Sequence, residues 1–122
     1  MKEKIINLSH YKSHKSSVFT GRPQGELVRK DMKLSLSDTN DEEKIIFIIP
    51  DDTTSFNPSF YLGMLYESLA SLKEECFQNK YAFKIDSDDA DQIKSIEKNL
   101  DDGYRSALNT LNKNFGFKSF SK

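Results

Sequence analysis

The pattern of apolar and polar positions predicts one long buried strand near the middle of the chain. Residues 45–49 (Ile-Ile-Phe-Ile-Ile) form an uninterrupted apolar run, followed by the polar segment 50–55. A run of β-branched and aromatic residues without polar alternation is typical of a strand that is covered on both faces, as in parallel sheets flanked by helices. We therefore expect residues 45–49 to form an interior strand. The loop at its carboxyl end is where open α/β sheets usually carry their working surface.

The clearest helix begins directly after this loop. Asn57 is a favourable N-cap and Pro58 a favourable first helical residue. Apolar residues then recur at the spacing that places them on one helical face: Leu62, Leu65, Tyr66, Leu69 and Leu72. Gly63 lies in the first turns of this helix, where the absence of a side chain would allow a close approach to the sheet.

The rest of the pattern predicts three further strands and two further helices. Strands are expected over residues 4–8, 16–20 and 80–85. A helix beginning near Pro23 carries a core-facing stripe made of Leu27, Val28, Met32, Leu34 and Leu36. A last helix beginning near Asp89 has the buried positions Ile93, Ile96, Leu100, Ala107, Leu108 and Leu111.

The order of these elements is strand, strand, helix, strand, helix, strand, helix. Strands separated by helices imply right-handed crossovers and a sheet that is at least partly parallel. We predict a single α/β domain over residues 1–122, with a mixed, partly parallel sheet of four to five strands and about three helices. Residues 9–15 are expected to form a turn or an edge hairpin, and residues 37–43 a solvated loop. In the C-terminal tail, residues 112–122, three phenylalanines either pack back onto the domain or face a partner.

Composition and charge narrow the class of protein. The chain has 122 residues, enough for one domain with a single core. Eighteen basic and nineteen acidic side chains give a formal net charge of −1, which disfavours binding to nucleic acid or to an anionic membrane surface. The longest apolar run is far shorter than the roughly 20 residues that span a bilayer, and the amino terminus lacks a signal-peptide core. We expect a soluble cytoplasmic protein, and the single Cys76 agrees with a reducing compartment.

Three segments together resemble the STAS domain, the fold of anti-sigma-factor antagonists. They are residues 18–21 before the first helix, the strand at residues 45–49, and residues 57–63 at the opening of the next helix. The resemblance extends over roughly residues 5–111. A narrower resemblance, to small bacterial STAS-like domains of unknown function, rests on Gly21, Arg22, Gly25, Arg29, Ser59 and Phe60.

The resemblance implies a non-catalytic regulatory or protein-interaction module, controlled by a kinase-like ATP-binding partner. In the antagonists, the second serine of an Asp-Ser-Ser-Gly motif is phosphorylated by a partner that is both anti-sigma factor and kinase. Ser59 matches that serine, while Asn57, Pro58 and Phe60 replace the other three residues. A phosphate near a helix N-terminus would meet free amide donors and the positive end of the helix dipole. The alternative is that Ser59 simply caps the helix or lines the loop.

The predicted partner surface joins the loop after the central strand to the start of the next helix. It comprises Asp51, Asp52, Phe56, Asn57, Phe60 and Tyr61. The three aromatic residues are of the type that dominates protein contacts when exposed, and the alternative for each is burial beneath the loop.

A second class of function, binding of a small anion or nucleotide, rests on the first helix. Two glycines and two arginines there could cradle an anion with backbone amides and guanidinium groups: Gly21, Arg22, Gly25 and Arg29. Their spacing is that of neither a P-loop nor a dinucleotide fingerprint. The alternative is a structural turn with solvated or ion-paired arginines.

Metal and catalytic sites receive little support from the sequence. His10 and His14 are four residues apart but lack a third ligand. The acidic segment 86–97 departs from a calcium loop at its fifth and sixth positions, and we expect Asp88 to be the N-cap of the last helix. Asp51 and its acidic neighbour lack a companion for general base chemistry. We therefore predict neither enzymatic activity nor a cofactor nor a metal.

Overall fold

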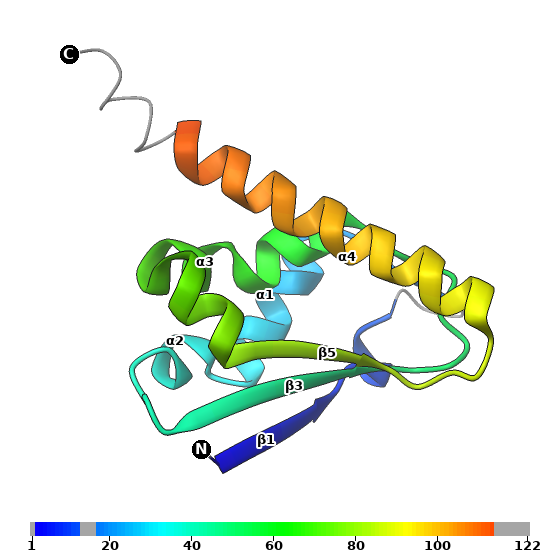
Figure 1. Ribbon diagram of the computed structural model, residues 1–122, viewed down its shortest axis with the longest axis horizontal. Helices are drawn as coiled ribbons and strands as arrows, with labels where there is room; N and C mark the ends of the chain where they lie inside the picture. Colours follow the sequence, from blue (N-terminus) through cyan, green and yellow to red (C-terminus); the bar gives the residue numbers. More distant parts are fainter. Residues whose placement is uncertain (1, 13–16, 114–122) are drawn as a thin grey trace.

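A parallel sheet of three strands forms the base of the fold in the computed structural model, which describes residues 2–12 and 17–113 (Figure 1). The strands are β1 (Lys2–Asn7), β3 (Glu43–Ile49) and β5 (Tyr81–Ile85), in the order β1-β3-β5. Both pairings are parallel. The prediction that residues 45–49 form a central strand of an α/β sheet is confirmed.

The two remaining strands of the described residues form a separate small sheet. β2 (Val18–Phe19) pairs in parallel with β4 (Ser55–Phe56). The predicted single sheet of four to five strands is therefore wrong. After β1 the chain turns through the 3-10 helix η1 (Ser9–Tyr11), and after β3 it turns at Pro50, so both ladders are interrupted before β2 and β4 begin. Residues 13–15 of the turn predicted at 9–15, and residue 16 of the strand predicted at 16–20, lie outside the described part.

The predicted first helix is two helices, α1 (Arg22–Asp31) and α2 (Leu34–Ser37). Lys33 between them has the left-handed backbone conformation, with φ of 53°, which ends the helical path. The break changes which residues the stripe buries. Val28 and Leu34 are fully buried, but Leu27 is 40% exposed and Leu36 is 67% exposed.

Helices α1 and α3 (Pro58–Lys80) cross at two glycines. A Cβ atom added to Gly63 would lie 2.1 Å from the backbone oxygen of Arg22, and one added to Gly25 would lie 2.1 Å from that of Phe60. The close approach that we predicted for Gly63 therefore exists, but its partner is α1 and not the sheet. The N-cap prediction is confirmed, because the Asn57 side chain accepts a hydrogen bond from the Ser59 amide.

A kink divides α3 at Lys73, whose φ of 67° and ψ of 169° are not helical. A Cβ atom disfavours this backbone region, and a residue other than glycine is destabilised by roughly 1–3 kcal/mol when it adopts it. We expect Lys73→Gly to raise the free energy of unfolding by about 1 kcal/mol, after the entropic cost of glycine. Urea unfolding followed by circular dichroism measures this change. Lys73→Ala is the control, because it removes the same side chain without relieving φ, and an equal gain in both variants would contradict the assigned strain.

Helix α4 (Ala90–Leu111) lies across α3 (Figure 1). Its N-cap is Asp89 and not Asp88 as predicted, since the Asp89 side chain accepts hydrogen bonds from the amides of Asp91 and Gln92. Gly103 allows the contact with α3, because a Cβ there would lie 2.6 Å from the Tyr61 ring. The three phenylalanines of the predicted tail lie outside the described residues.

Candidate functional site

The central strand is buried on only one of its two faces. Ile45, Phe47 and Ile49 are fully buried against the helices, whereas Ile46 and Ile48 between them are only half-buried. The predicted coverage of both faces is therefore wrong. Both crossovers step in the same direction, from β1 to β3 and from β3 to β5, and right-handed crossovers of that kind place their helices on the same face.

The neighbouring strands extend the uncovered side of β3 into a small apolar surface. Ile5, Ile46 and Ala82 lie in one row of the sheet, and Ile48 lies in the row between Asn7 and Lys84. Ile5 is 57% exposed. We call the surface formed by Ile5, Ile46, Ile48 and Ala82 the open face.

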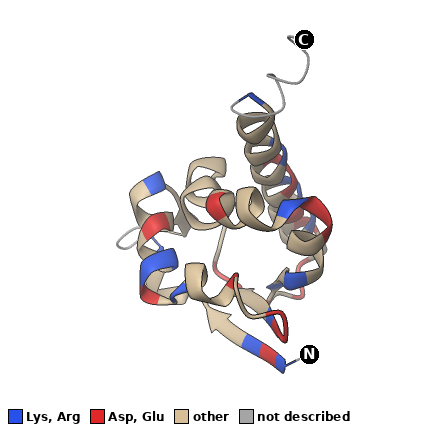
Figure 2. Ribbon diagram, turned by 90° about the vertical axis from the view of Figure 1, so that its left-hand side faces the viewer, with Lys and Arg blue, Asp and Glu red and all other residues tan. Residues whose placement is uncertain are grey.

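Charged residues border the open face. Glu3 and Lys44 are register partners at one end, and β1 begins with alternating basic and acidic residues, visible near the N-terminus in Figure 2. Basic and acidic residues are also interleaved over the helices in that view.

Purely parallel sheets are normally covered on both faces. The open face is therefore a surface of the kind that another structural element covers.

The aromatic residues of the predicted partner surface lie in the core. Phe56 and Phe60 are fully buried and Tyr61 is 4% exposed. Their rings pack against one another and against Phe19 and Phe83, with ring centroids 5.1–5.9 Å apart. The expectation of an exposed aromatic anchor is wrong, because these rings fill the space between the small sheet, α3 and β5.

The polar residues of the same prediction do lie at the surface. Asp51, Asp52 and Asn57 are exposed. The Gln92 amide holds the loop from α4 by donating to the backbone oxygens of Asp51 and Thr53, at 2.6 and 2.5 Å. A hydrogen bond from the Lys12 ammonium lowers the pKa of Asp52. These carboxylates are therefore part of a loop that is tied to the body of the protein.

Ser59 joins the starts of α1 and α3. Its hydroxyl accepts a hydrogen bond from the Gly21 amide at 3.1 Å and donates one to the Asn57 side chain at 2.7 Å. Two segments that the sequence suggested separately, one at Gly21 and one at Ser59, are thus in contact. Ser59 does not cap α3, whose N-cap is Asn57, so of the two roles that we gave as the alternative it has the second: its hydroxyl lines the junction of the two helix starts.

The four residues of the predicted anion cradle do not converge on one site. Gly25 faces α3, and Arg22 is half exposed with Glu26 3.9 Å away. Arg29 is 8% exposed, and the anion that it binds belongs to this chain, because its Nη2 donates to Asp38 at 3.0 Å. The predicted ion-paired alternative therefore describes Arg29.

Arg29 and Asp38 belong to a buried polar network that sequence reasoning missed. Ser68 accepts from Arg29 Nη1 at 2.7 Å and donates to Asp38 Oδ2 at 2.8 Å. The Tyr81 hydroxyl donates to the other oxygen of Asp38. Asp38 lies in the segment predicted as a solvated loop, yet it is only 7% exposed. Its partners come from α1, α3 and β5, so no spacing along the chain could have indicated the network.

Buried tyrosines make stability sensitive to alkaline pH. Burial, and then the hydrogen bond to Asp38, raises the pKa of Tyr81, and burial also raises the pKa of Tyr61. The folded state therefore holds both phenolic protons more tightly, and this stability is present below the ordinary tyrosine pKa and lost as pH rises above it. We expect the free energy of unfolding to fall by about 1.4 kcal/mol per pH unit for each tyrosine above pH ~10. Urea unfolding between pH 8 and 11 measures the slope.

The variant Tyr61→Phe/Tyr81→Phe is the matched test of that slope. It lacks both phenolic protons, so its stability should fall much less steeply than that of the wild type over the same pH range. A variant that loses stability as steeply as the wild type would assign the alkaline sensitivity to other groups.

Among the described residues, no three His, Cys, Asp or Glu side chains gather where they could hold a metal ion. In the same part of the chain, no helix combines the length and the apolar character needed to cross a bilayer. No protein-family model, curated protein or solved structure matches this chain. The resemblance to STAS domains therefore stays a prediction.

Proposed function

We propose that this protein is a non-catalytic protein-interaction module whose partner covers the open face. One observation carries the proposal: a parallel sheet that has helices on one face, and Ile5, Ile46 and Ile48 on the other. Apolar side chains gathered on a parallel sheet are typical of a surface that a further layer buries. The charged groups at its edge, Glu3 and Lys84 among them, suit the polar rim of such an interface.

The size of the open face favours a single amphipathic helix as the element that covers it. The outer strands of a three-stranded sheet are roughly 10 Å apart, which is about the diameter of one helix. Residues 3–7 of β1 span roughly 13 Å along the strand.

The non-catalytic part of the proposal is supported by the state of the buried polar groups. Arg29, Asp38, Ser68 and Tyr81 are the kinds of side chain that converge in active sites, but here they hydrogen-bond to one another inside the core. Groups that satisfy one another in this way stabilise the arrangement of α1, α3 and β5.

Regulation by a kinase-like partner is a narrower proposal that centres on Ser59. It is supported by the position of the hydroxyl, which is half-buried and holds the starts of α1 and α3 together through Gly21. A phosphate there would lie at two helix N-termini and would replace a hydroxyl that now donates to Asn57. Such a change would shift the contact between the two helices.

Affinity capture from the host with tagged variants tests the proposal. Ile46→Lys charges the open face, while Leu27→Lys makes a similar change at another exposed residue, on α1. We expect the wild type and Leu27→Lys to retain a host protein that Ile46→Lys does not retain. The three tagged proteins should have identical circular-dichroism spectra, which shows that each is folded. Equal retention by all three would contradict the assigned surface. A further variant, Ser59→Asp, places a negative charge where the phosphate would be. If its affinity for the purified partner equals that of the wild type, the proposed regulation through Ser59 is contradicted.

A further inference from the structure

The outer edge of β1 carries main-chain groups that no other described residue uses. β1 is the end strand of the order β1-β3-β5, and it lies at the rim of the molecule in Figure 1 and in Figure 2. The amides of Lys2 and Leu8 donate to carbonyl oxygens in or next to β3. Successive residues of a strand direct their N–H and C=O groups to opposite edges, so those of Glu3, Ile5 and Asn7 point away from β3. Within the described part, these outward groups have no hydrogen-bond partner.

This edge of the sheet is open to a further strand. β1 contains neither a proline nor a bulge, which are common protections of edge strands, because its register with β3 is continuous. Among the described elements, only β3 makes more than slight contact with β1. At the other edge, outward groups of β5 are already used: the Tyr81 amide donates to Phe77, and the Ile85 carbonyl accepts from Ser87.

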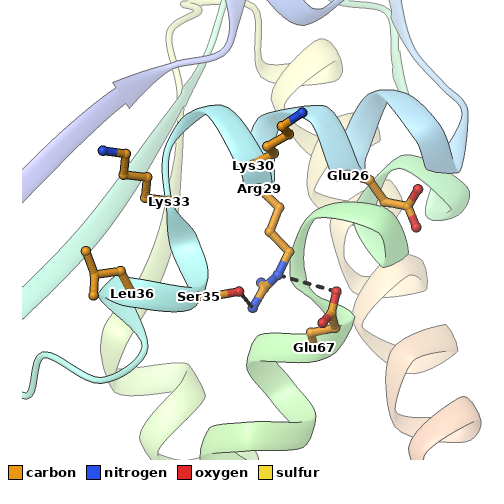
Figure 3. A pocket seen from close by; sticks show the side chains of 7 residues that line it. All are labelled: Glu26, Arg29, Lys30, Lys33, Ser35, Leu36 and Glu67. Atoms are coloured by element: carbon orange, nitrogen blue, oxygen red, sulfur yellow. Dashed lines mark hydrogen bonds and ion pairs between the residues drawn. The ribbon is translucent and has the colours of Figure 1, made fainter.

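The polar groups of the pocket between α1, α2 and α3, of about 480 Å³, do not converge in a comparable way (Figure 3). The ammonium groups of Lys30 and Lys33 point away from the Arg29 guanidinium. Arg29 itself is paired, because its Nη2 donates to Ser35 at 3.1 Å and its Nε is 3.6 Å from the Glu67 carboxylate. The row of main-chain groups on β1 is therefore the better defined binding feature.

The sequence of β1 is complementary to itself in the antiparallel direction. When Ile5 is placed opposite Ile5 of a second copy, Glu3 lies opposite Asn7, and each of these residues exchanges both main-chain hydrogen bonds with its counterpart. The two Ile5 side chains, each 57% exposed in the single chain, then pack against each other. A register centred on Lys4 would instead place two ammonium groups opposite each other, which is destabilising.

We propose that two copies of this protein associate through antiparallel pairing of their β1 strands, with Ile5 at the twofold axis. The two three-stranded sheets then form one continuous sheet, and their open faces adjoin across the axis. This inference goes beyond the proposed function, because it uses the main-chain edge of β1 and holds whether or not a host protein covers the open face.

Sedimentation velocity of the full chain tests the pairing. The wild type should form a dimer as its concentration rises, and Ile5→Val should keep it. Ile5→Pro should be monomeric with the circular-dichroism spectrum of the wild type, because proline removes an amide that the pairing uses and that has no partner within the described part of one chain. A wild type that stays monomeric, or an Ile5→Pro protein as dimeric as the wild type, would overturn the proposal.

Disulfide cross-linking in a Cys76→Ser background identifies the residues that meet. Ile5→Cys should give a covalent dimer under mild oxidation, because the Cα atoms of hydrogen-bonded opposite residues are roughly 5.5 Å apart, within disulfide reach. Ile46→Cys is the matched control, since Ile46 lies in the same row one strand inward and its two copies would be roughly 14 Å apart. Failure of Ile5→Cys to cross-link, or equal cross-linking of both variants, would overturn the pairing.

Charge changes test the register, because Glu3 lies opposite Asn7 of the second copy. Asn7→Asp opposes two acidic groups while keeping the side-chain acceptor that the Ser9 amide uses, so it should raise the dimer Kd by about threefold or more. Glu3→Lys/Asn7→Asp makes the opposed groups opposite in charge and should dimerise more tightly than Asn7→Asp. Equal Kd values for the two variants would refute the register.

Ile46→Lys separates this inference from the proposed function. It should lose the host protein, because it charges the open face, and it should remain a dimer, because Ile46 lies on the central strand away from the β1 edge. A monomeric Ile46→Lys protein would assign the contact between copies to the open face and would overturn pairing through β1.

Discussion

Replacing Gly63 with alanine is expected to lower the free energy of unfolding by about 3 kcal/mol or more. The added Cβ would lie 2.1 Å from the backbone oxygen of Arg22 and 3.0 Å from the amide of Glu26. Both obstacles are backbone atoms of α1, so relief of the clash requires that α1 and α3 move apart. That movement would loosen the packing of Val28 and Met64, which are fully buried.

Urea unfolding followed by circular dichroism measures the effect, with Gly21→Ala as the control. Gly21 also has an unusual backbone, with φ of 90°, but a Cβ there would meet only the Pro23 ring at 4.0 Å. Its replacement should cost about 1 kcal/mol, from backbone strain alone. A Gly63→Ala protein within 1 kcal/mol of the wild type would show that the two helices do not approach as closely as described.

The second large effect is expected when Asp38 is replaced with alanine. The carboxylate accepts hydrogen bonds from Arg29, Ser68 and Tyr81, and its loss leaves the buried guanidinium with only the exposed Glu67 carboxylate, 3.6 Å away, as a counter-ion. Breaking a buried pair in this way costs about 3–5 kcal/mol. Asp52→Ala removes an ion pair of similar kind, with Lys12, from a carboxylate that is 66% exposed, and should cost less than about 1 kcal/mol.

Removal of both charges separates the ion pair from its burial. The variant Arg29→Met/Asp38→Leu replaces the pair with apolar side chains, and apolar replacements of buried pairs are often tolerated. We expect it to be more stable than Asp38→Ala, although Ser68 and Tyr81 lose partners. If the double variant is the less stable of the two, Arg29 contributes mainly through its other contacts, such as the bond to Met64.

Local features of the sequence predicted the elements of this fold well. The strand at residues 45–49 and the start of α3 follow from side-chain preferences that act within a few residues, so Asn57 and Pro58 are found in their expected roles. The left-handed conformation of Lys33 could not be predicted, because lysine has no preference for it. The predicted core-facing stripe therefore included Leu36, which lies beyond the end of α1.

The sites were harder to predict because they depend on which segments meet. Arg29 and Asp38 are joined only because α2 folds back on α1, and the interior position of Phe60 follows from its contacts with the small sheet. The apolar run that includes Ile46 suggested coverage on both faces, but strand composition alone does not count the layers that pack on a sheet. The direction of both crossovers decides that number.

The open face is tested most directly by comparing Ile45→Thr with Ile46→Thr in urea unfolding. These adjacent residues are chemically identical and point to opposite faces of β3, and threonine keeps the branching that suits a strand. With only one covered face, Ile45→Thr should cost about 2–4 kcal/mol and Ile46→Thr less than about 1 kcal/mol. Equal and large losses in the two variants would mean that both faces are covered, and would contradict the open face.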